Sequence, residues 1–203
     1  ESDVSGTAEA IAESIAQADL VMIAVPDAAI ADTALALGAT AAVIVHISGA
    51  TGLDVLAGHA RVGSIHPLMS LPDADTGARR LADGCTFAVD GDPFALDVVA
   101  SLGGLAVEVP ETKRALYHAA ASVAANHLTA LCAQVERLAE TVGIPVDAYW
   151  KMMAATLDNV EEGGARAALT GPAARGDWAT VRSHLDALPL SEQTLYRALM
   201  VEA

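Results

Sequence analysis

The stretch KRALYHAAASVAANHLTALCAQVERLAE, residues 113–140, decides how this chain is organised. It holds neither Gly nor Pro, and Ala and Leu dominate it, so the sequence predicts one long helix. At about 100° per residue one side of this helix carries uncharged polar groups: His118, Ser122, Asn126 and Thr129. The opposite side is apolar: Leu116, Ala120, Val123, Leu131 and Leu138. We interpret the helix as a spine with both faces covered, one of them lining a polar cleft.

Each polar residue on this side of the helix, taken singly, could also have a purely structural role in a packed core. A Ser or Thr on a helix often bonds to the carbonyl four residues earlier, and a lone Asn or His can be satisfied within a core. The alignment of four such residues on one side favours a site.

The composition excludes several classes of protein. The chain has 203 residues, of which 53% are hydrophobic and 18% charged, so it can bury a core and is not disordered. Its net charge of −15 repels phosphate backbones and anionic lipid, which argues against nucleic-acid and membrane partners. Cys85 and Cys132 stand alone and predict neither a disulfide nor a metal site.

Two apolar runs, residues 33–53 and 115–135, are long enough to span a bilayer without a formal charge. The first contains three Gly, a His and a Ser, and the second contains two His, an Asn and a Gln, so neither is a convincing span. No signal peptide opens the sequence. Together with the isolated cysteines, this predicts a protein of the reducing cytoplasm.

The first part of the chain alternates strands with helices. The run DLVMIAV, residues 19–25, is continuously apolar, which is typical of a parallel strand covered on both faces. Further strands are expected at residues 41–47, 61–65, 86–89 and 106–109. Beyond Pro110 only helical patterns occur. The sequence therefore predicts an α/β domain with a parallel sheet at 1–110 and an all-helical domain at 111–203.

Three predicted strands end in small or polar residues: Val25-Pro26-Asp27, Ser48-Gly49 and His66-Pro67. Ligands of open parallel sheets bind beyond the carboxyl ends of the strands, so we expect these groups to meet there. Ser-Gly and His-Pro are also common turn formers, which is the alternative explanation for each taken singly.

His66 is the candidate for proton transfer, because an imidazole can give or take a proton near neutral pH. Ser48 and Asn126 are expected to orient a substrate oxygen. His118 and Lys113 open the long helix; either could donate to a carbonyl, although Lys113 could equally lie at the surface. Arg175 stands in a Gly-flanked loop that could clamp a carboxylate, or it could simply belong to a helix-capping turn.

A resemblance to a known family rests on five motifs: Val25-Pro26-Asp27, His46-Ile47-Ser48-Gly49-Ala50, Gly63-Ser64-Ile65-His66-Pro67-Leu68, Tyr117-His118-Ala119-Ala120 with Asn126, and Leu169-Thr170-Gly171-Pro172 with Arg175-Gly176-Asp177. Their order and spacing resemble proteins with a Rossmann-like domain followed by the domain of unknown function DUF2520. That group is similar to the 6-phosphogluconate-dehydrogenase-like oxidoreductases, which include prephenate dehydrogenases, ketopantoate reductases and pyrroline-5-carboxylate reductases. The resemblance covers nearly all of the chain.

The resemblance implies an oxidoreductase that uses a nicotinamide cofactor, NADP, with Val25, Pro26, Ser48 and Gly49 beside it. Ser48 and His66 fall on the catalytic positions of prephenate dehydrogenases, but the turn continues Leu68-Met69-Ser70 without their glycine. The Lys and Asn that ketopantoate reductases carry have no clear counterparts in this sequence either. A small 2-oxo acid such as ketopantoate is the substrate class we expect, with His66, Ser48, His118 and Asn126 at its reacting oxygen and Arg175 at its carboxylate.

The dinucleotide-binding pattern Gly-x-Gly-x-x-Gly is missing from the sequence. In a Rossmann fold the strand at residues 19–25 would be about the fourth, so roughly the first two βα units are expected to be absent from this chain. A non-catalytic nucleotide-binding or scaffold protein is therefore the rival interpretation. The apolar faces of the helical half, which include Trp150, Met152 and Leu195, predict a homodimer.

Overall fold

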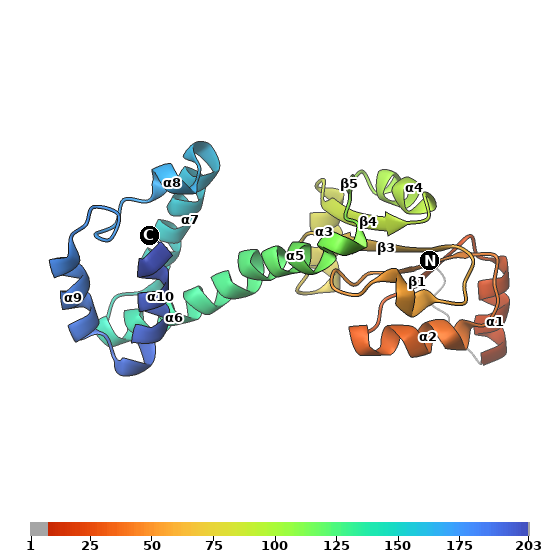
Figure 1. The fold of residues 1–203 in the computed structure, drawn as a ribbon, viewed down its shortest axis with the longest axis horizontal. Helices are drawn as coiled ribbons and strands as arrows, with labels where there is room; N and C mark the ends of the chain where they lie inside the picture. The colour runs from red at the N-terminus through yellow and green to blue at the C-terminus, as the bar shows by residue number, and fades with distance from the viewer. Residues whose placement is uncertain (1–7, 203) are drawn as a thin grey trace. The chain divides into compact units, whose positions relative to one another are not determined.

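The computed structural model of the chain describes residues 8–202 and contains two compact units (Figure 1). The first ends at Asn126 and the second begins at His127. All the described strands belong to the first unit, and beyond Pro110 the described chain is helical. The predicted change from α/β to helical structure is therefore confirmed, while a domain boundary at residue 110 stays a prediction.

The first unit is a five-stranded sheet with the order β1-β2-β3-β4-β5. The strands are β1 (Leu20–Ile23), β2 (Val43–His46), β3 (Val62–Pro67), β4 (Thr86–Gly91) and β5 (Leu105–Glu108). The helices around them are α1 (Ala8–Gln17), η1 (Asp27–Ala29), α2 (Ile30–Leu37), η2 (Leu53–Leu56), α3 (Ala74–Ala82) and α4 (Phe94–Ser101). Each expected strand is present, with ends that differ by a few residues.

One pairing departs from the expected parallel sheet. β1, β2 and β3 are parallel to one another and β4 is parallel to β5, but β4 runs antiparallel to β3. The Leu68 N–H donates to the carbonyl of Thr86 at 2.8 Å, so the chain starts β4 at the edge where β3 ends. The carboxyl ends of β4 and β5 therefore lie at the opposite edge from those of β1, β2 and β3.

Each face of the sheet has its own apolar cluster. On one face Val45, Ile65 and Phe87 pack against Ala95 and Val99 of α4. On the other face Ile23 and Ile44 pack against Ile30 and Ala34 of α2 and against Leu56 of η2. This packing accounts for the continuous apolar run of β2, which is buried throughout, whereas Met22 of β1 is 45% exposed.

The predicted long helix is present as three helical segments. They are α5 (Glu111–Ser122), a π-helical turn η3 (Val123–His127) and α6 (Leu128–Val142). The left-handed Gly143, at φ 72°, ends the last of them. Leu116 and Val123, which we expected to be covered, are 75% and 54% exposed in the structure.

The second unit is built from α6, α7 (Val146–Gly163), α8 (Ala165–Ala168), α9 (Trp178–Ala187) and α10 (Leu190–Glu202). Arg137 of α6 forms two hydrogen bonds with the Glu192 carboxylate of α10, at 2.7 and 3.0 Å. The buried Gln134 side chain donates to the Glu192 carbonyl at 2.9 Å. These contacts fix α6 against α10. Among the described residues, no helix combines the length and the apolar character that crossing a bilayer requires.

Candidate functional site

The candidate site lies where β1, β2 and β3 end and where α5 passes over the sheet. Arg114 of α5 bonds to Ser64, and Tyr117, one turn later, bonds to His66, so α5 runs along β3 toward its carboxyl end. This path carries Tyr117 and His118 to the edge that the sequence predicts for ligand binding.

His66 is half-buried and is contacted by Tyr117 and His118. Its Nδ1 lies 2.6 Å from the Tyr117 hydroxyl oxygen. The Tyr117 and His118 rings meet it edge to face, with ring centroids 5.7 and 6.1 Å away. Nε2 makes no hydrogen bond to any described residue and is not a buried atom. The ring therefore keeps one nitrogen available for a ligand.

The backbone of Gly49 lies against one face of the His66 ring. A Cβ added there would lie 2.8–2.9 Å from three atoms of the His66 imidazole, so only glycine lets the ring approach the backbone so closely. In the structure it is the His66 ring that approaches Gly49, and Gly49 as a cofactor contact stays a prediction.

Ser48 precedes Gly49, and its hydroxyl is engaged in its own turn. Its Oγ accepts hydrogen bonds from the N–H groups of Ala50 and Thr51, at 3.1 and 3.0 Å, and donates to the Thr51 hydroxyl at 3.0 Å. The side chain is 8% exposed. In this structure Ser48 shapes the loop under His66, which is the turn-forming role that the sequence also allows.

A row of polar side chains crosses the sheet beside the site, and no local sequence pattern indicates it. His46, Ser64 and Asp90 are register partners on β2, β3 and β4, so they point to one face. Arg114, only 3% exposed, donates to Ser64 Oγ at 3.2 Å and to Asp90 at 2.9 Å. Its Nε donates to Glu111 at 3.0 Å. Two carboxylates thus neutralise the buried guanidinium.

Burial and neighbouring charge keep the site histidine neutral. Burial lowers the pKa of His66, and His118 and Arg114 lower it further, while the Asp27 carboxylate acts in the opposite direction. At neutral pH the uncharged imidazole therefore predominates.

The fully buried His46 is also kept neutral. Burial lowers its pKa most, and the Arg114 guanidinium lowers it further. Its Nδ1 accepts from the Ser48 N–H at 3.2 Å, so its proton resides on Nε2. That atom makes no hydrogen bond within the described residues.

The remaining predicted site residues are less closely tied to His66. Val25 and the exposed Pro26 lie directly after β1. Asn126 is exposed and ends the first unit, eight residues and about 12 Å of helix rise beyond His118. Among the described residues no hydrogen bond joins it to His66. Asn126 and His118 stay predictions for the site.

Arg175 belongs to the second unit. It is exposed, and its guanidinium donates to the carbonyl of Thr170 within its own loop. Asp177 caps α9 by accepting from the Thr180 N–H at 3.1 Å. The role of Arg175 at a carboxylate stays a prediction.

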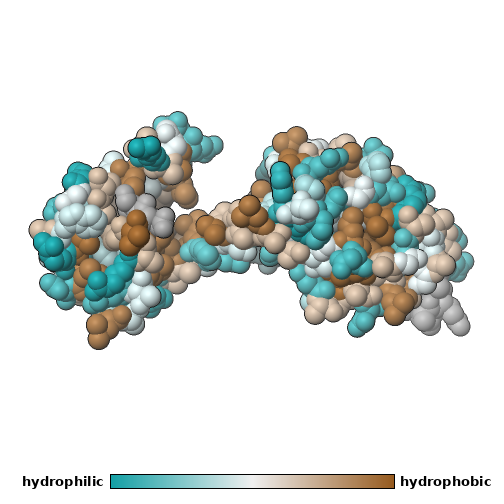
Figure 2. All heavy atoms as spheres, viewed as in Figure 1, coloured by the Kyte–Doolittle hydropathy of each residue, from teal (hydrophilic) through white to brown (hydrophobic). Residues whose placement is uncertain are grey.

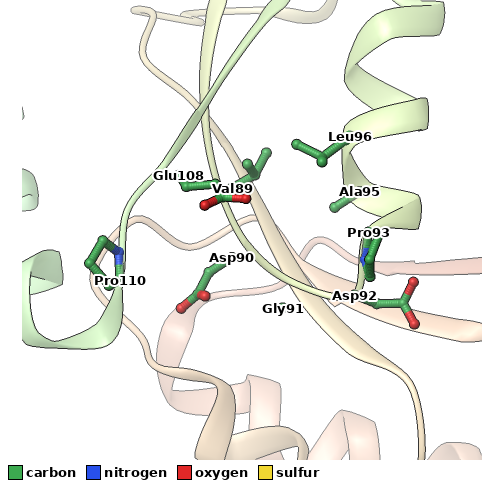
Figure 3. Close-up of a pocket in the computed structure, with 9 residues that line it drawn as sticks. All are labelled: Val89, Asp90, Gly91, Asp92, Pro93, Ala95, Leu96, Glu108 and Pro110. Carbon is green, nitrogen blue, oxygen red and sulfur yellow. The ribbon is translucent and has the colours of Figure 1, made fainter.

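A cavity opens at the other edge of the sheet (Figure 3). Its volume is about 420 Å³, and its lining includes Asp90, Asp92 and Glu108. Asp90 is paired with Arg114 and Asp92 with Arg61, at 2.9 Å each. Since β4 and β5 end there, this cavity is separate from the edge that holds His66.

Tyr117 and Arg114 are the two residues that sequence reasoning did not assign to the site. Tyr117 stood within the motif Tyr117-His118-Ala119-Ala120, so its place next to His118 was the available signal. Arg114 comes directly after Lys113, and nothing in the sequence indicates which of two neighbouring cations faces the sheet. Arg114 is the one that faces the sheet, because it bonds to Asp90 and Ser64, which lie 24 and 50 residues away in the sequence.

Comparison with protein families finds two matches. Residues 5–72 match the Rossmann-like domain, and residues 85–202 match the domain of unknown function DUF2520. No curated protein matches the sequence.

Solved structures with the same fold include three informative examples. Protein TM1727 from Thermotoga maritima is 27% identical with a TM-score of 0.74, over 90% of this chain and 76% of that one. The candidate NADP oxidoreductase BF3122 from Bacteroides fragilis is 23% identical with a TM-score of 0.78, over 95% and 77% of the two chains. The 1-pyrroline-5-carboxylate reductase of Streptococcus pyogenes is 16% identical with a TM-score of 0.59, over 94% and 77%.

Proposed function

Because this chain belongs to the DUF2520 family and has a Rossmann-like domain, we propose that it is an NADP-dependent oxidoreductase. The single observation that carries the proposal is His66, a half-buried histidine with an accessible Nε2 at the carboxyl edge of the sheet. The names of the Bacteroides fragilis and Streptococcus pyogenes proteins, an NADP oxidoreductase and a reductase, support the choice of chemistry.

We place the nicotinamide end of such a cofactor at the edge of the sheet beside His66. Gly49 has no side chain of its own, and Ser48 folds its hydroxyl into the turn rather than toward a ligand. When bound, a reduced nicotinamide supplies a hydride. Val25, Pro26, Ser48 and Gly49 are the residues that we place beside it.

The substrate that we propose is a small carboxylate-bearing carbonyl compound, and a 2-oxo acid such as ketopantoate is the first to test. His66 gives the proton to its oxygen, with His118 and Asn126 as further hydrogen-bond donors. Arg175 is proposed to bind the carboxylate, because a guanidinium can donate two parallel hydrogen bonds to it. Arg175→Lys keeps the charge and loses this geometry, so it should raise KM more than it lowers kcat.

The test is single-turnover oxidation of NADPH by the full-length protein with a panel of 2-oxo acids. His66→Ala should slow the reaction by about 10²–10⁴-fold, the usual contribution of a general acid. His184→Ala is the matched control, because His184 also pairs through Nδ1 with a tyrosine hydroxyl, at 2.7 Å, but in an exposed position of the second unit. Parental activity in His66→Ala would contradict the assignment.

We also propose that the protein is a homodimer. Large apolar side chains of the second unit are exposed, among them Met152 at 59%, Leu157 at 53% and Leu199 at 41%. Figure 2 shows apolar atoms at the surface of this unit. Such surface is typical of an interface between subunits. Sedimentation equilibrium should give twice the chain mass, and a monomer across the accessible concentration range would exclude this assembly.

A further inference from the structure

The hydroxyl of Tyr117 forms the one direct side-chain hydrogen bond that His66 makes in the described part of the chain. The bond is 2.6 Å long and reaches Nδ1, the nitrogen on the far side of the ring from the accessible Nε2. The two rings stand nearly perpendicular, at 87°. Tyr117 therefore touches His66 where it can control the ring without occupying the ligand-facing nitrogen.

We propose that Tyr117 is a positioning residue that donates its phenolic hydrogen to Nδ1 and thereby keeps the proton of neutral His66 on Nε2. The imidazole then presents a hydrogen-bond donor to the substrate oxygen. This inference rests on the proposed function, in which His66 protonates that oxygen.

The direction of the hydrogen bond is set by the surroundings of the phenol. Burial raises the pKa of Tyr117, so the phenol keeps its hydrogen at neutral pH. Nδ1 of His66 is its only acceptor among the described residues. If Nδ1 donated instead, the phenolic hydrogen would lack a partner in a part-buried place, which costs about 1–3 kcal/mol.

The packing around the ring keeps this arrangement in place. Gly49 backs one face of the imidazole, and the His118 ring stands against it with a centroid distance of 6.1 Å. The charged or titratable groups that act on His66 are Asp27 from η1 and Arg114, Tyr117 and His118 from α5. Of these, only the Tyr117 hydroxyl bonds to the ring.

The arrangement explains how a neutral imidazole can protonate a substrate. If a bound reduced nicotinamide supplied a hydride to the carbonyl carbon, the Nε2–H bond of His66 would break and an O–H bond would form on the substrate oxygen. The phenolic O–H bond breaks in turn and an Nδ1–H bond forms, so the imidazole remains neutral. The phenolate of Tyr117 recovers its proton from water. An alkoxide is a far stronger base than a phenolate, whose parent phenol has a pKa of about 10, so the transfer is favourable.

The decisive measurement is the tautomer of His66 by nitrogen-15 NMR of histidine-labelled protein, at a pH where the ring is neutral. The parent should show a protonated Nε2 and an unprotonated Nδ1. Tyr117→Phe removes only the hydroxyl and should give a mixture of both tautomers. Tyr196→Phe is the control, since it removes the equivalent hydroxyl from His184 in the second unit and should leave His66 unchanged.

The kinetic counterpart uses the same two variants. Tyr117→Phe should lower kcat for NADPH oxidation by about 10- to 100-fold, with little change in KM and an altered pH profile, whereas Tyr196→Phe should match the parent. A parental His66 tautomer in Tyr117→Phe, or a parent with the proton on Nδ1, overturns the inference. So does full activity in Tyr117→Phe. If no substrate is reduced by any form, the proposed function fails, while the NMR result still decides the tautomer.

Discussion

Arg114 brings a permanent positive charge into the interior of the first unit, where it is 3% exposed. Asp90 keeps 27% of its side chain exposed and Glu111 keeps 66%, so the carboxylates that neutralise the guanidinium remain partly hydrated. This arrangement lowers the cost of desolvation, because only one charged member of the network is fully removed from water.

Replacing Arg114 should test how much this network contributes. Arg114→Met should destabilise the protein by about 2–3 kcal/mol, because it leaves Asp90 uncompensated and the buried Ser64 hydroxyl without its partner. Arg61→Met is the control, since it breaks an exposed pair with Asp92, just beyond the end of the same strand, and should have a much smaller effect. Urea denaturation of both variants provides the measurement, and equal losses would argue against the buried network.

The two neutral histidines should make stability depend on pH. Burial lowers the folded-state pKa of both His46 and His66 below the ordinary value of about 6.5. Well above about pH 6.5 both rings are neutral in either state. As the pH falls below that value the unfolded chain takes up protons that the folded protein resists, so stability declines.

Denaturation at about pH 7.5 and about pH 5.5 should therefore show a lower free energy of unfolding at the lower pH. His66→Gln should reduce this difference, because one of the two linked groups is gone. The carboxylates with lowered pKa values, Asp73, Asp92, Asp177 and Glu192, titrate in a more acidic range and leave this window to the histidines. A variant as pH-dependent as the parent would contradict the assignment.

At the scale of elements, the long helix shows where sequence reasoning succeeds and where it stops. Its extent was predictable from the lack of Gly and Pro, and the helical segments run from Glu111 to Val142. The π-helical turn at Val123–His127 was not, because the letters VAANH contain no helix breaker. Such a turn accommodates an extra residue and rotates the side chains after it by about 100° around the helix axis.

The strands also combine features that the sequence predicts with features that it does not. Continuous apolar runs and the terminal His66-Pro67 located β1, β2 and β3 and the edge where they end. The antiparallel direction of β4 is set by its whole ladder with β3, from Gly63 opposite Gly91 to Pro67 opposite Phe87, and these partners lie far apart in the sequence. Local patterns carry strand identity, whereas strand direction is decided by pairing.

The end of β4 offers a sharp test of backbone fit. Gly91 has φ 92°, and a Cβ there would lie 2.3 Å from the Val62 carbonyl oxygen. Gly91→Ala should cost about 3 kcal/mol or more, because both the dihedral angle and the backbone contact are unfavourable. Gly84→Ala is the matched control, with φ 98° and nothing within 4 Å, and should cost about 1–2 kcal/mol. Thermal denaturation compares the stability of the two variants. A smaller loss of stability in Gly91→Ala than in Gly84→Ala would refute the predicted clash.

At the scale of the whole molecule, cofactor binding and turnover can be separated. A ligand that binds only the folded state stabilises it by mass action, by about 2.7 kcal/mol at 100 times Kd. NADP should therefore raise the Tm of the full-length protein more than NAD or FAD does. A rise in Tm without NADPH oxidation would favour a non-catalytic nucleotide-binding protein, and no shift with any dinucleotide would contradict both functions.

The glycine beneath the imidazole has a consequence for natural variation in this family. No side chain can be accommodated at position 49 while a histidine occupies position 66 in this pose. Evolution can therefore not change these positions independently: a lineage that acquires a larger residue at 49 must first lose the histidine or re-route its backbone. Aligned relatives should show the pair being kept or abandoned together, and a common Ala-His combination would mean that the loop can move aside.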